Sequence, residues 1–204
     1  MAVLDIRVLG DPILRERTAV LKEVTDSTRA LISDMFETMY AAEGIGLAAP
    51  QVGRSERVCV VDVDGTPLAL VNPEIASREG IDRGEEGCLS IPEIFGDVDR
   101  SEHIVVRALD QDGKPIETEA HDLLARCILH ELDHLDGKLF IDYMSLLKRK
   151  FMARKWEAEA AKYPGFIRKL DPATPRKRRS RSRSGADAAV NAGEPTDPPF
   201  EPEL

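Results

Sequence analysis

The stretch HELDH, residues 130–134, places two of the chain's four histidines four positions apart, with a glutamate directly after the first. Residues four apart lie on one face of an α-helix, so His130 and His134 can bind one metal ion. Glu131 is rotated by about 100° from His130 and can face a metal-bound water instead of binding the metal. A metal lowers the pKa of its water from about 15.7 toward about 7, and a carboxylate beside it can take the proton. The stretch therefore predicts a metal site with its own general base.

The alternative interpretation of this stretch is an ordinary charged helix face that contacts solvent. His130 and His134 share their face with Leu123 and Cys127, which indicates that this face points inward. Two inward-facing histidines one turn apart are costly to bury unless something binds them. The pattern therefore favours the metal site.

The third ligand is not fixed by the HELDH stretch itself. An extended zinc-protease motif would place a third histidine at position 140, which is Phe140, and Glu157 and Glu159 lie in a highly charged segment. Cys127 lies about 10 Å along the helix axis from the second histidine, too far to share its ion. Cys88 follows a glycine in EEGCLSIP, where the backbone can expose a side chain to a ligand. Cys88 is the best candidate.

Outward from HELDH, the hydrophobic pattern predicts helices on both sides of a group of strands. Apolar residues recur at helical spacing from the Thr25–Ser27 cap candidates to just before Gly44, and again over about 122–136 and 146–163. Strand-like runs such as RVCVVDVDG lie between the first two helices, and DQDG (110–113) is typical of a hairpin turn. The expected class is α+β with a mainly antiparallel sheet.

Length and composition limit the number of domains and the location of the protein. The chain has 204 residues, 42% of them apolar, which is enough for one sizeable domain. We assign that domain to residues 1–169, followed by a disordered tail at 170–204 rich in proline, serine and arginine. No apolar run suits a membrane span, the N-terminus lacks a signal-peptide pattern, and three scattered cysteines do not form a disulfide framework. A cytoplasmic protein with no membrane partner is expected.

The charge distribution separates the domain from its tail. The net charge is −9, and residues 171–204 contain six basic and six acidic side chains, so the whole excess lies on residues 1–170. An acidic domain argues against DNA as a partner. Residues 176–183, RKRRSRSR, carry six cations in eight positions and are a separate candidate for binding a phosphate-rich surface.

Three segments together resemble the peptide deformylase family. They are GIGLAAPQ (44–51), EGCLS (86–90) and HELDHL (130–135), and their order and separations match the bacterial members of the family over about residues 3–165. The resemblance implies an α+β fold in which a mainly antiparallel sheet packs around a central HExxH metal-binding helix. It also implies hydrolysis of the formyl group from the N-terminal formylmethionine of newly synthesised proteins, with release of formate.

The resemblance also implies roles for individual residues. The metal ligands would be Cys88, His130 and His134; the catalytic groups would be Glu131 as general base, with Gln51 and the backbone N–H of Leu89 holding the oxyanion. The methionine side chain and the peptide would contact Gly44, Ile45, Gly46, Leu123 and Cys127. The implied metal is Fe²⁺, one per chain, with Ni²⁺, Co²⁺ or Zn²⁺ as substitutes. Ligand softness alone predicts zinc.

One residue departs from the family pattern, and two other functions stay open. Position 129, usually Gln, is Leu129, which we interpret as a packing change that leaves the ligands intact. A member that binds peptides or ribosomes without turnover, and a zinc endopeptidase, are the alternatives. The partners expected for the deformylase are N-formylmethionyl nascent peptides and the ribosome, the latter through the basic segment 148–163 and the tail.

Overall fold

The chain forms an α+β fold, as the sequence predicted. The structure is a computed structural model that describes residues 2–170, so all of the expected tail except Leu170 lies outside the described residues. The helices are α1 (Asp26–Ala41), α2 (Asp122–Leu135) and α3 (Leu146–Ala160), with short 3-10 helices at Pro12–Arg15, Ala49–Val52, Phe140–Tyr143 and Pro164–Phe166. The strands are β1 (Ile6–Arg7), β2 (Gly46–Ala48), β3 (Val58–Val63), β4 (Thr66–Glu79), β5 (Asp82–Cys88), β6 (Ile91–Arg100), β7 (His103–Leu109), β8 (Pro115–His121) and β9 (Ile167–Arg168).

All strand pairings within these elements are antiparallel. The main sheet has five strands in the order β2-β3-β4-β7-β8, so β2 and β8 are its edges, while β5 pairs with β6 and β1 with β9. The expected turn at 110–113 joins β7 to β8. The sequence pattern did not predict strand β5, which carries Cys88 at its end.

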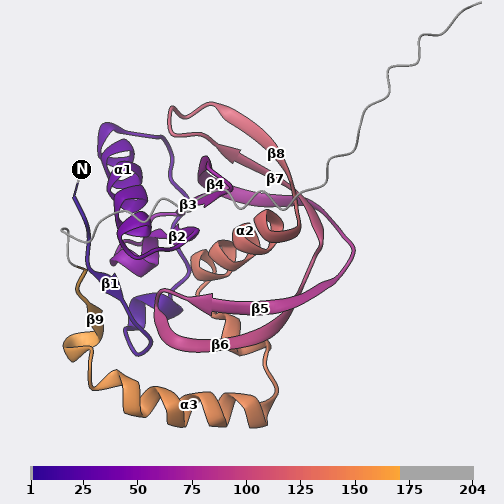
Figure 1. Cartoon of the computed structure of the whole chain (residues 1–204). Coiled ribbons are helices and arrows are strands. Elements are labelled where there is room, and N and C mark those ends of the chain that lie inside the picture. The colour runs from indigo at the N-terminus through magenta and orange to yellow at the C-terminus, as the bar shows by residue number, and fades with distance from the viewer. Residues whose placement is uncertain (1, 171–204) are drawn as a thin grey trace, which may run out of the picture.

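The main sheet is covered on both faces, and strand β3 shows why. Its side chains alternate in direction, so Cys59 and Val61 pack on one face with α2, whereas Val58 and Val60 pack on the other with α1. Both sets are buried, which explains why VCVVDV is nearly continuously apolar. Figure 1 shows α2 in the middle of the molecule, between the main sheet and the β5–β6 hairpin.

The ends of the helices follow local chemistry. Thr25 caps α1 by accepting a hydrogen bond from the backbone N–H of Thr28, so the predicted cap is confirmed. Helix α2 ends at Leu135, and Gly137 follows with φ of +72°, in the left-handed region that glycine adopts without strain. A Cβ at position 137 would also lie 2.6 Å from the carbonyl oxygen of Arg15.

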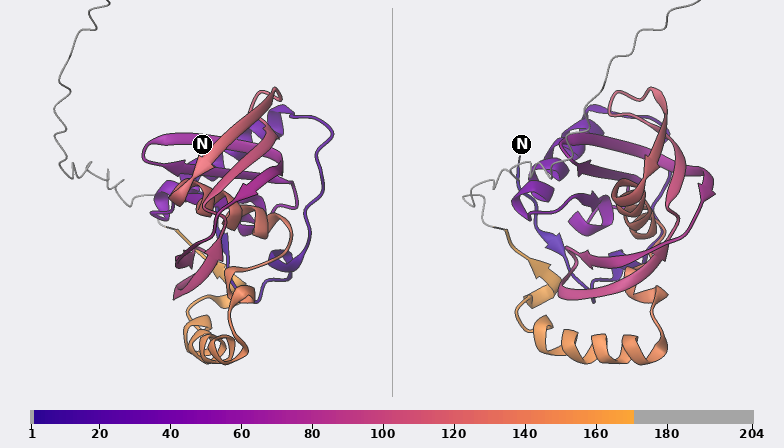
Figure 2. Two further views of the ribbon diagram at one scale, coloured as in Figure 1. Left: turned by 90° about the vertical axis from the view of Figure 1, so that its right-hand side faces the viewer. Right: turned by 45° about the vertical axis from the view of Figure 1, so that its right-hand side comes forward.

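Helix α3 lies beneath the β5–β6 hairpin, away from the main sheet (Figure 2). Trp156 is its one buried residue; it packs in a third core with Ile91 and Ile94 of β6 and donates a hydrogen bond to the carbonyl of Leu9 at 3.1 Å. Among residues 2–170, none of the helices combines the length and the apolar character that a membrane crossing requires.

Candidate metal centre and active site

Helix α2 places His130 and His134 on one buried face, as the HELDH spacing predicted. The residues are 8% and 1% exposed, and their ring centroids are 5.0 Å apart. Burial lowers the pKa of His134 well below its usual value, because the protonated ring would lose its hydration. A neutral imidazole is the form that binds a metal.

Cys88 joins the two histidines from the end of β5. A register irregularity between Gly87 and Cys88 ends the regular pairing of the hairpin at this point. The Cys88 Sγ lies 3.1 Å from Nε2 of His134, and the candidate ligand atoms of Cys88, His130 and His134 all lie within 4.8 Å of one another. Of the candidates left open by spacing alone, the structure therefore brings Cys88 to the histidine pair.

These three side chains fit a transition metal. The Sγ–Nε2 separation is shorter than the sum of typical metal–sulfur (about 2.3 Å) and metal–nitrogen (about 2.0–2.1 Å) distances, so one ion can contact both atoms. One thiolate and two imidazoles suit iron, zinc, nickel or cobalt rather than magnesium or calcium. Oε2 of the neighbouring Glu131 is buried without a hydrogen-bond partner among the described residues, and a ligand bound here would supply one.

Glu86 contacts the side of the His130 ring that faces away from the centre, and it was not predicted from the sequence. Its carboxylate lies 2.9 Å from Nδ1 of His130, which leaves Nε2 of that ring for the metal. Arg100 donates to both Glu86 oxygens at 2.8 and 2.9 Å, and Arg126 donates to one of them at 2.9 Å. Although burial acts in the opposite direction, hydrogen bonds from Arg100 and His130 lower the pKa of Glu86 to about 2. The carboxylate is therefore held charged against the histidine.

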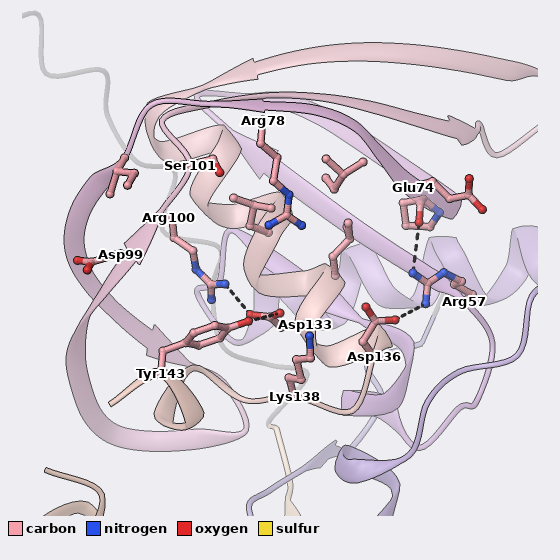
Figure 3. Close-up of a pocket in the computed structure, with 15 residues that line it drawn as sticks. Arg57, Glu74, Arg78, Asp99, Arg100, Ser101, Asp133, Asp136, Lys138 and Tyr143 are labelled. Carbon is pink, nitrogen blue, oxygen red and sulfur yellow. Dashed lines mark hydrogen bonds and ion pairs between the residues drawn. The ribbon is translucent and has the colours of Figure 1, made fainter. Parts of the chain in front are cut away.

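Arg100 also lines a pocket on the other side of α2, which Figure 3 shows. This cavity of about 470 Å³ is lined by residues that include Arg100, Leu129, Asp133 and Tyr143, but by none of the three candidate ligands. The guanidinium of Arg100 bonds Asp133, and the hydroxyl of Tyr143 donates to the same carboxylate at 2.7 Å. Leu129, where the family usually has Gln, thus faces this pocket and the core instead of the metal centre.

Glu131 lies beside the candidate ligands in a dry environment. It is 3% exposed, and burial raises the pKa of its carboxyl to about 7. Strand β2 passes so close that a Cβ on Gly46 would lie 2.3 Å from Glu131 Oε1 and 2.7 Å from Cys127 Sγ. Glycine at position 46 is therefore what lets the edge strand approach this carboxylate.

Gln51 reaches the centre from the 3-10 helix that follows β2. Its Oε1 accepts a hydrogen bond from the backbone N–H of Ala48 at 2.7 Å, and because that N–H can only donate, the amide orientation is fixed. Nε2 then points to the centre, donating to Ser90 Oγ at 3.2 Å and to Cys88 Sγ at 3.6 Å. The side chain of Gln51, which the resemblance implied as a catalytic group, is 1% exposed and lies next to a candidate ligand.

The residues predicted to contact substrate lie around the same edge. Cys127 Sγ donates to the carbonyl of Ile45 at 3.3 Å, and burial raises the pKa of this thiol, so it stays protonated. A Cβ on Gly44 would lie 2.8 Å from the Leu89 side chain, which places the turn after Cys88 against the start of the glycine segment. Leu123 differs from the others, because it lies in the first turn of α2 and is 49% exposed. It is therefore the outermost member of this group of predicted contact residues.

Comparison with known proteins identifies the family. The family model for polypeptide deformylase matches residues 3–150. The chain belongs to the polypeptide deformylase family. A peptide deformylase of Alkalilimnicola ehrlichii is 57% identical over 161 residues, covering 77% of this chain and 90% of that protein.

Solved structures agree with both the fold and the family. A Legionella pneumophila peptide deformylase is 44% identical, with a TM-score of 0.75, over 78% of this chain and 98% of that one. An Ehrlichia chaffeensis peptide deformylase in complex with actinonin is 38% identical, with a TM-score of 0.76 and the same coverage. The chain is therefore a metal-dependent hydrolase that removes the N-terminal formyl group from nascent proteins.

Proposed function

We propose that this deformylase works with Fe²⁺, one ion per chain, held by Cys88, His130 and His134. The observation that carries this assignment is the meeting of three buried donor side chains from two separate elements, with atoms within 4.8 Å of one another. Ni²⁺, Co²⁺ and Zn²⁺ suit the same donor set and are expected to substitute. Such an ion polarises the formyl carbonyl and makes water a stronger nucleophile.

In this proposal Glu131 moves the proton. It takes a proton from the attacking water and delivers it to the amine that leaves, so formate and a free N-terminus are the products. The buried position of the carboxyl, with Oε2 unpartnered among the described residues, supports this role, because a water there has an acceptor without competitors.

The proposed oxyanion donors are the Gln51 amide and the backbone N–H of Leu89. The fixed direction of Gln51 Nε2 supports its part, since a donor that is held in place needs no reorganisation during the reaction. Losing one such donor typically costs about 2.7–4 kcal/mol of barrier.

The peptide substrate is proposed to add to β2 as an extra strand. Strand β2 is an edge of the main sheet; it begins at Gly46, and Gly44 and Ile45 directly precede it. The backbone groups on its free side can therefore pair with an extended peptide. The methionine side chain would then lie against Ile45 and Cys127, which are in contact with each other, with the exposed Leu123 further out on the same helix face.

An assay of formate release tests the assignment. Full-length protein, purified and assayed anaerobically with Fe²⁺, is expected to release formate from formyl-Met-Ala-Ser. Acetyl-Met-Ala-Ser, which carries a larger acyl group, is the matched control and should release no acetate. Cleavage inside the peptide without formate would instead indicate an endopeptidase, and binding without turnover would indicate a nonenzymatic role.

The Fe²⁺ form is expected to lose activity in air. A centre that accepts water is also open to oxygen, and thiolate ligands such as Cys88 are oxidisable. Protein loaded with Ni²⁺ should keep its activity over the same period in aerated buffer. Equal half-lives for the two forms would count against iron as the working metal.

The ribosome is the proposed partner that supplies the substrate. Helix α3 carries Lys148, Arg149, Lys150, Arg154 and Lys155, and residues 176–183 add six more cations to an otherwise acidic protein. These cations would bind ribosomal RNA and hold the active site near the emerging chain. An acidic domain is repelled by a phosphate-rich surface, so binding there requires such local cations.

Truncation after Leu170 is expected to weaken ribosome binding without changing kinetics on short formyl-peptides. Each phosphate contact lowers log K by about 0.7–0.9 per decade of salt, so the truncated chain should also show a flatter salt dependence. Sedimentation with ribosomes across a salt series measures both effects. Equal sedimentation of the truncated and full-length chains would show that the tail is not an anchor.

A further inference from the structure

The two histidines that the metal centre does not use lie together at another place. His103 in β7 and His121 at the end of β8 are directly opposite partners in the antiparallel ladder. Opposite residues point to the same face of a sheet, and so does Glu119, two positions before His121. All four histidines of the chain are thus found in two pairs, each with carboxylates nearby.

The three side chains offer donor atoms around one point. The imidazole rings stack with centroids 4.2 Å apart and planes 4° from parallel. Oε1 of Glu119 lies 2.9 Å from Nε2 of His103 and 3.6 Å from Nε2 of His121, and the three candidate ligand atoms all lie within 4.8 Å of one another. Glu79, the partner of His103 in β4, adds a carboxylate oxygen 3.7 Å from Nδ1 of the same ring.

One of these atoms lacks a hydrogen-bond partner among residues 2–170. Nε2 of His103 is buried, and it forms no hydrogen bond with any of them although the Glu119 oxygen is only 2.9 Å away. At that distance the failure is one of direction, because the oxygen lies off the line of the ring N–H. A carboxylate oxygen this close to an unprotonated ring nitrogen is electrostatically unfavourable unless a cation or a proton lies near both atoms.

We propose that His103, His121 and Glu119 form a second metal site, separate from the deformylase centre. Two imidazoles and a carboxylate suit Zn²⁺, Ni²⁺ or Cu²⁺, and the absence of a thiolate from this trio distinguishes it chemically from the Cys88 centre. The His121 side chain is 59% exposed, so its ring can leave the stack and turn its lone pair toward the ion. The fourth position is open to water or to Glu79.

The location gives the site a structural consequence. His121 is the N-cap residue of α2, and the next residue, Asp122, has φ of +48° and donates its backbone N–H to the Glu102 carbonyl at 2.9 Å. An ion at this site would join the start of β7 to the end of β8, at the residue directly before the helix that carries His130. Nine residues separate His121 from His130, about 13.5 Å along a helix, so the two sites do not share ligands.

Metal stoichiometry of the untagged full-length chain tests the site. Equilibrium dialysis against Zn²⁺, followed by elemental analysis, is expected to give two ions per wild-type chain. His121→Asn and Glu119→Gln should each give one. Glu117→Gln is the matched control, because Glu117 lies on the same strand and pairs with Arg107 instead, and it should keep two. Because the side chains of His121 and Glu119 are exposed, both variants are expected to fold. Circular dichroism checks that they do.

Co²⁺ absorption separates this proposal from the assignment of the deformylase centre. Co²⁺ bound by Cys88 gives a sulfur-to-metal charge-transfer band, whereas Co²⁺ bound by His103, His121 and Glu119 does not. The first equivalent of Co²⁺ should therefore produce the band, and the second should not. Cys88→Ser should abolish the band but still bind one Co²⁺, and adding His121→Asn to that variant should remove this ion. The same ion count in wild type, His121→Asn and Glu119→Gln would overturn the second site whatever the outcome at Cys88.

Discussion

Replacing Glu131 with glutamine is expected to lower kcat for formyl-Met-Ala-Ser by about 10²–10⁴-fold, the range in which a positioned general acid–base group contributes. The amide has nearly the same shape as the carboxylate but cannot accept the proton of the attacking water or pass it to the leaving amine. Because Glu131 is proposed to stand beside the metal and not to bind it, the variant should still contain one ion at the Cys88 centre. Steady-state kinetics and elemental analysis of the same preparation measure both quantities.

Glu117→Gln is the control for Glu131→Gln, since it makes the same chemical change at an exposed position that pairs with Arg107. It should keep wild-type turnover and metal. If Glu131→Gln lost the metal together with the activity, Glu131 would be a ligand and the proposed coordination would be wrong. Wild-type turnover with full metal content would remove it from proton transfer.

The second large effect is expected from Cys88→Ser. Serine keeps the size of the side chain but offers a neutral hydroxyl where the proposal needs a soft anionic ligand. Losing an outer-shell partner of a metal ligand typically lowers metal affinity 10–100-fold, so losing the ligand itself should lower it by more than about 100-fold. The folded state should persist, because Cys88 lies at a hairpin end and not in the centre of a core. Competition with a chelator measures the affinity.

Cys127→Ser is the matched control for Cys88→Ser. Cys127 is buried within the same region but donates to the carbonyl of Ile45, a bond that a hydroxyl can also make. This variant should retain metal affinity at the wild-type level. Wild-type affinity in Cys88→Ser would exclude Cys88 and reopen the question of Cys127 and the downstream glutamates as the third ligand.

The helices and the histidine pair could be predicted because each depends on residue spacing within one or a few turns of helix. The spacing of apolar residues gave α1 and α2 with their ends, and HELDH placed two histidines on one face. The inward direction of that face was predicted from Leu123 and Cys127. It is confirmed at Cys127, which is buried with the histidines, whereas Leu123 in the first turn is 49% exposed.

The rest depends on contacts between distant segments, which spacing cannot reveal. Glu86 meets His130 across 44 positions, and nothing in EEG marks that glutamate as different from its neighbour. Strand β5 was missed because its alternation is of charge and glycine, with one buried side chain in seven residues, so it has no apolar periodicity. Likewise, His103 and His121 meet only through the register of β7 and β8.

X-ray absorption at the zinc edge tests the central claim most directly, because it counts the atoms around the ion. The sample is the chain with His121→Asn, which removes the second site, loaded with one equivalent of Zn²⁺. The proposed centre predicts one sulfur at about 2.3 Å and two imidazole nitrogens at about 2.0–2.1 Å. A shell with only nitrogen and oxygen, or with two sulfur atoms, would contradict the assignment of Cys88, His130 and His134 as the ligands.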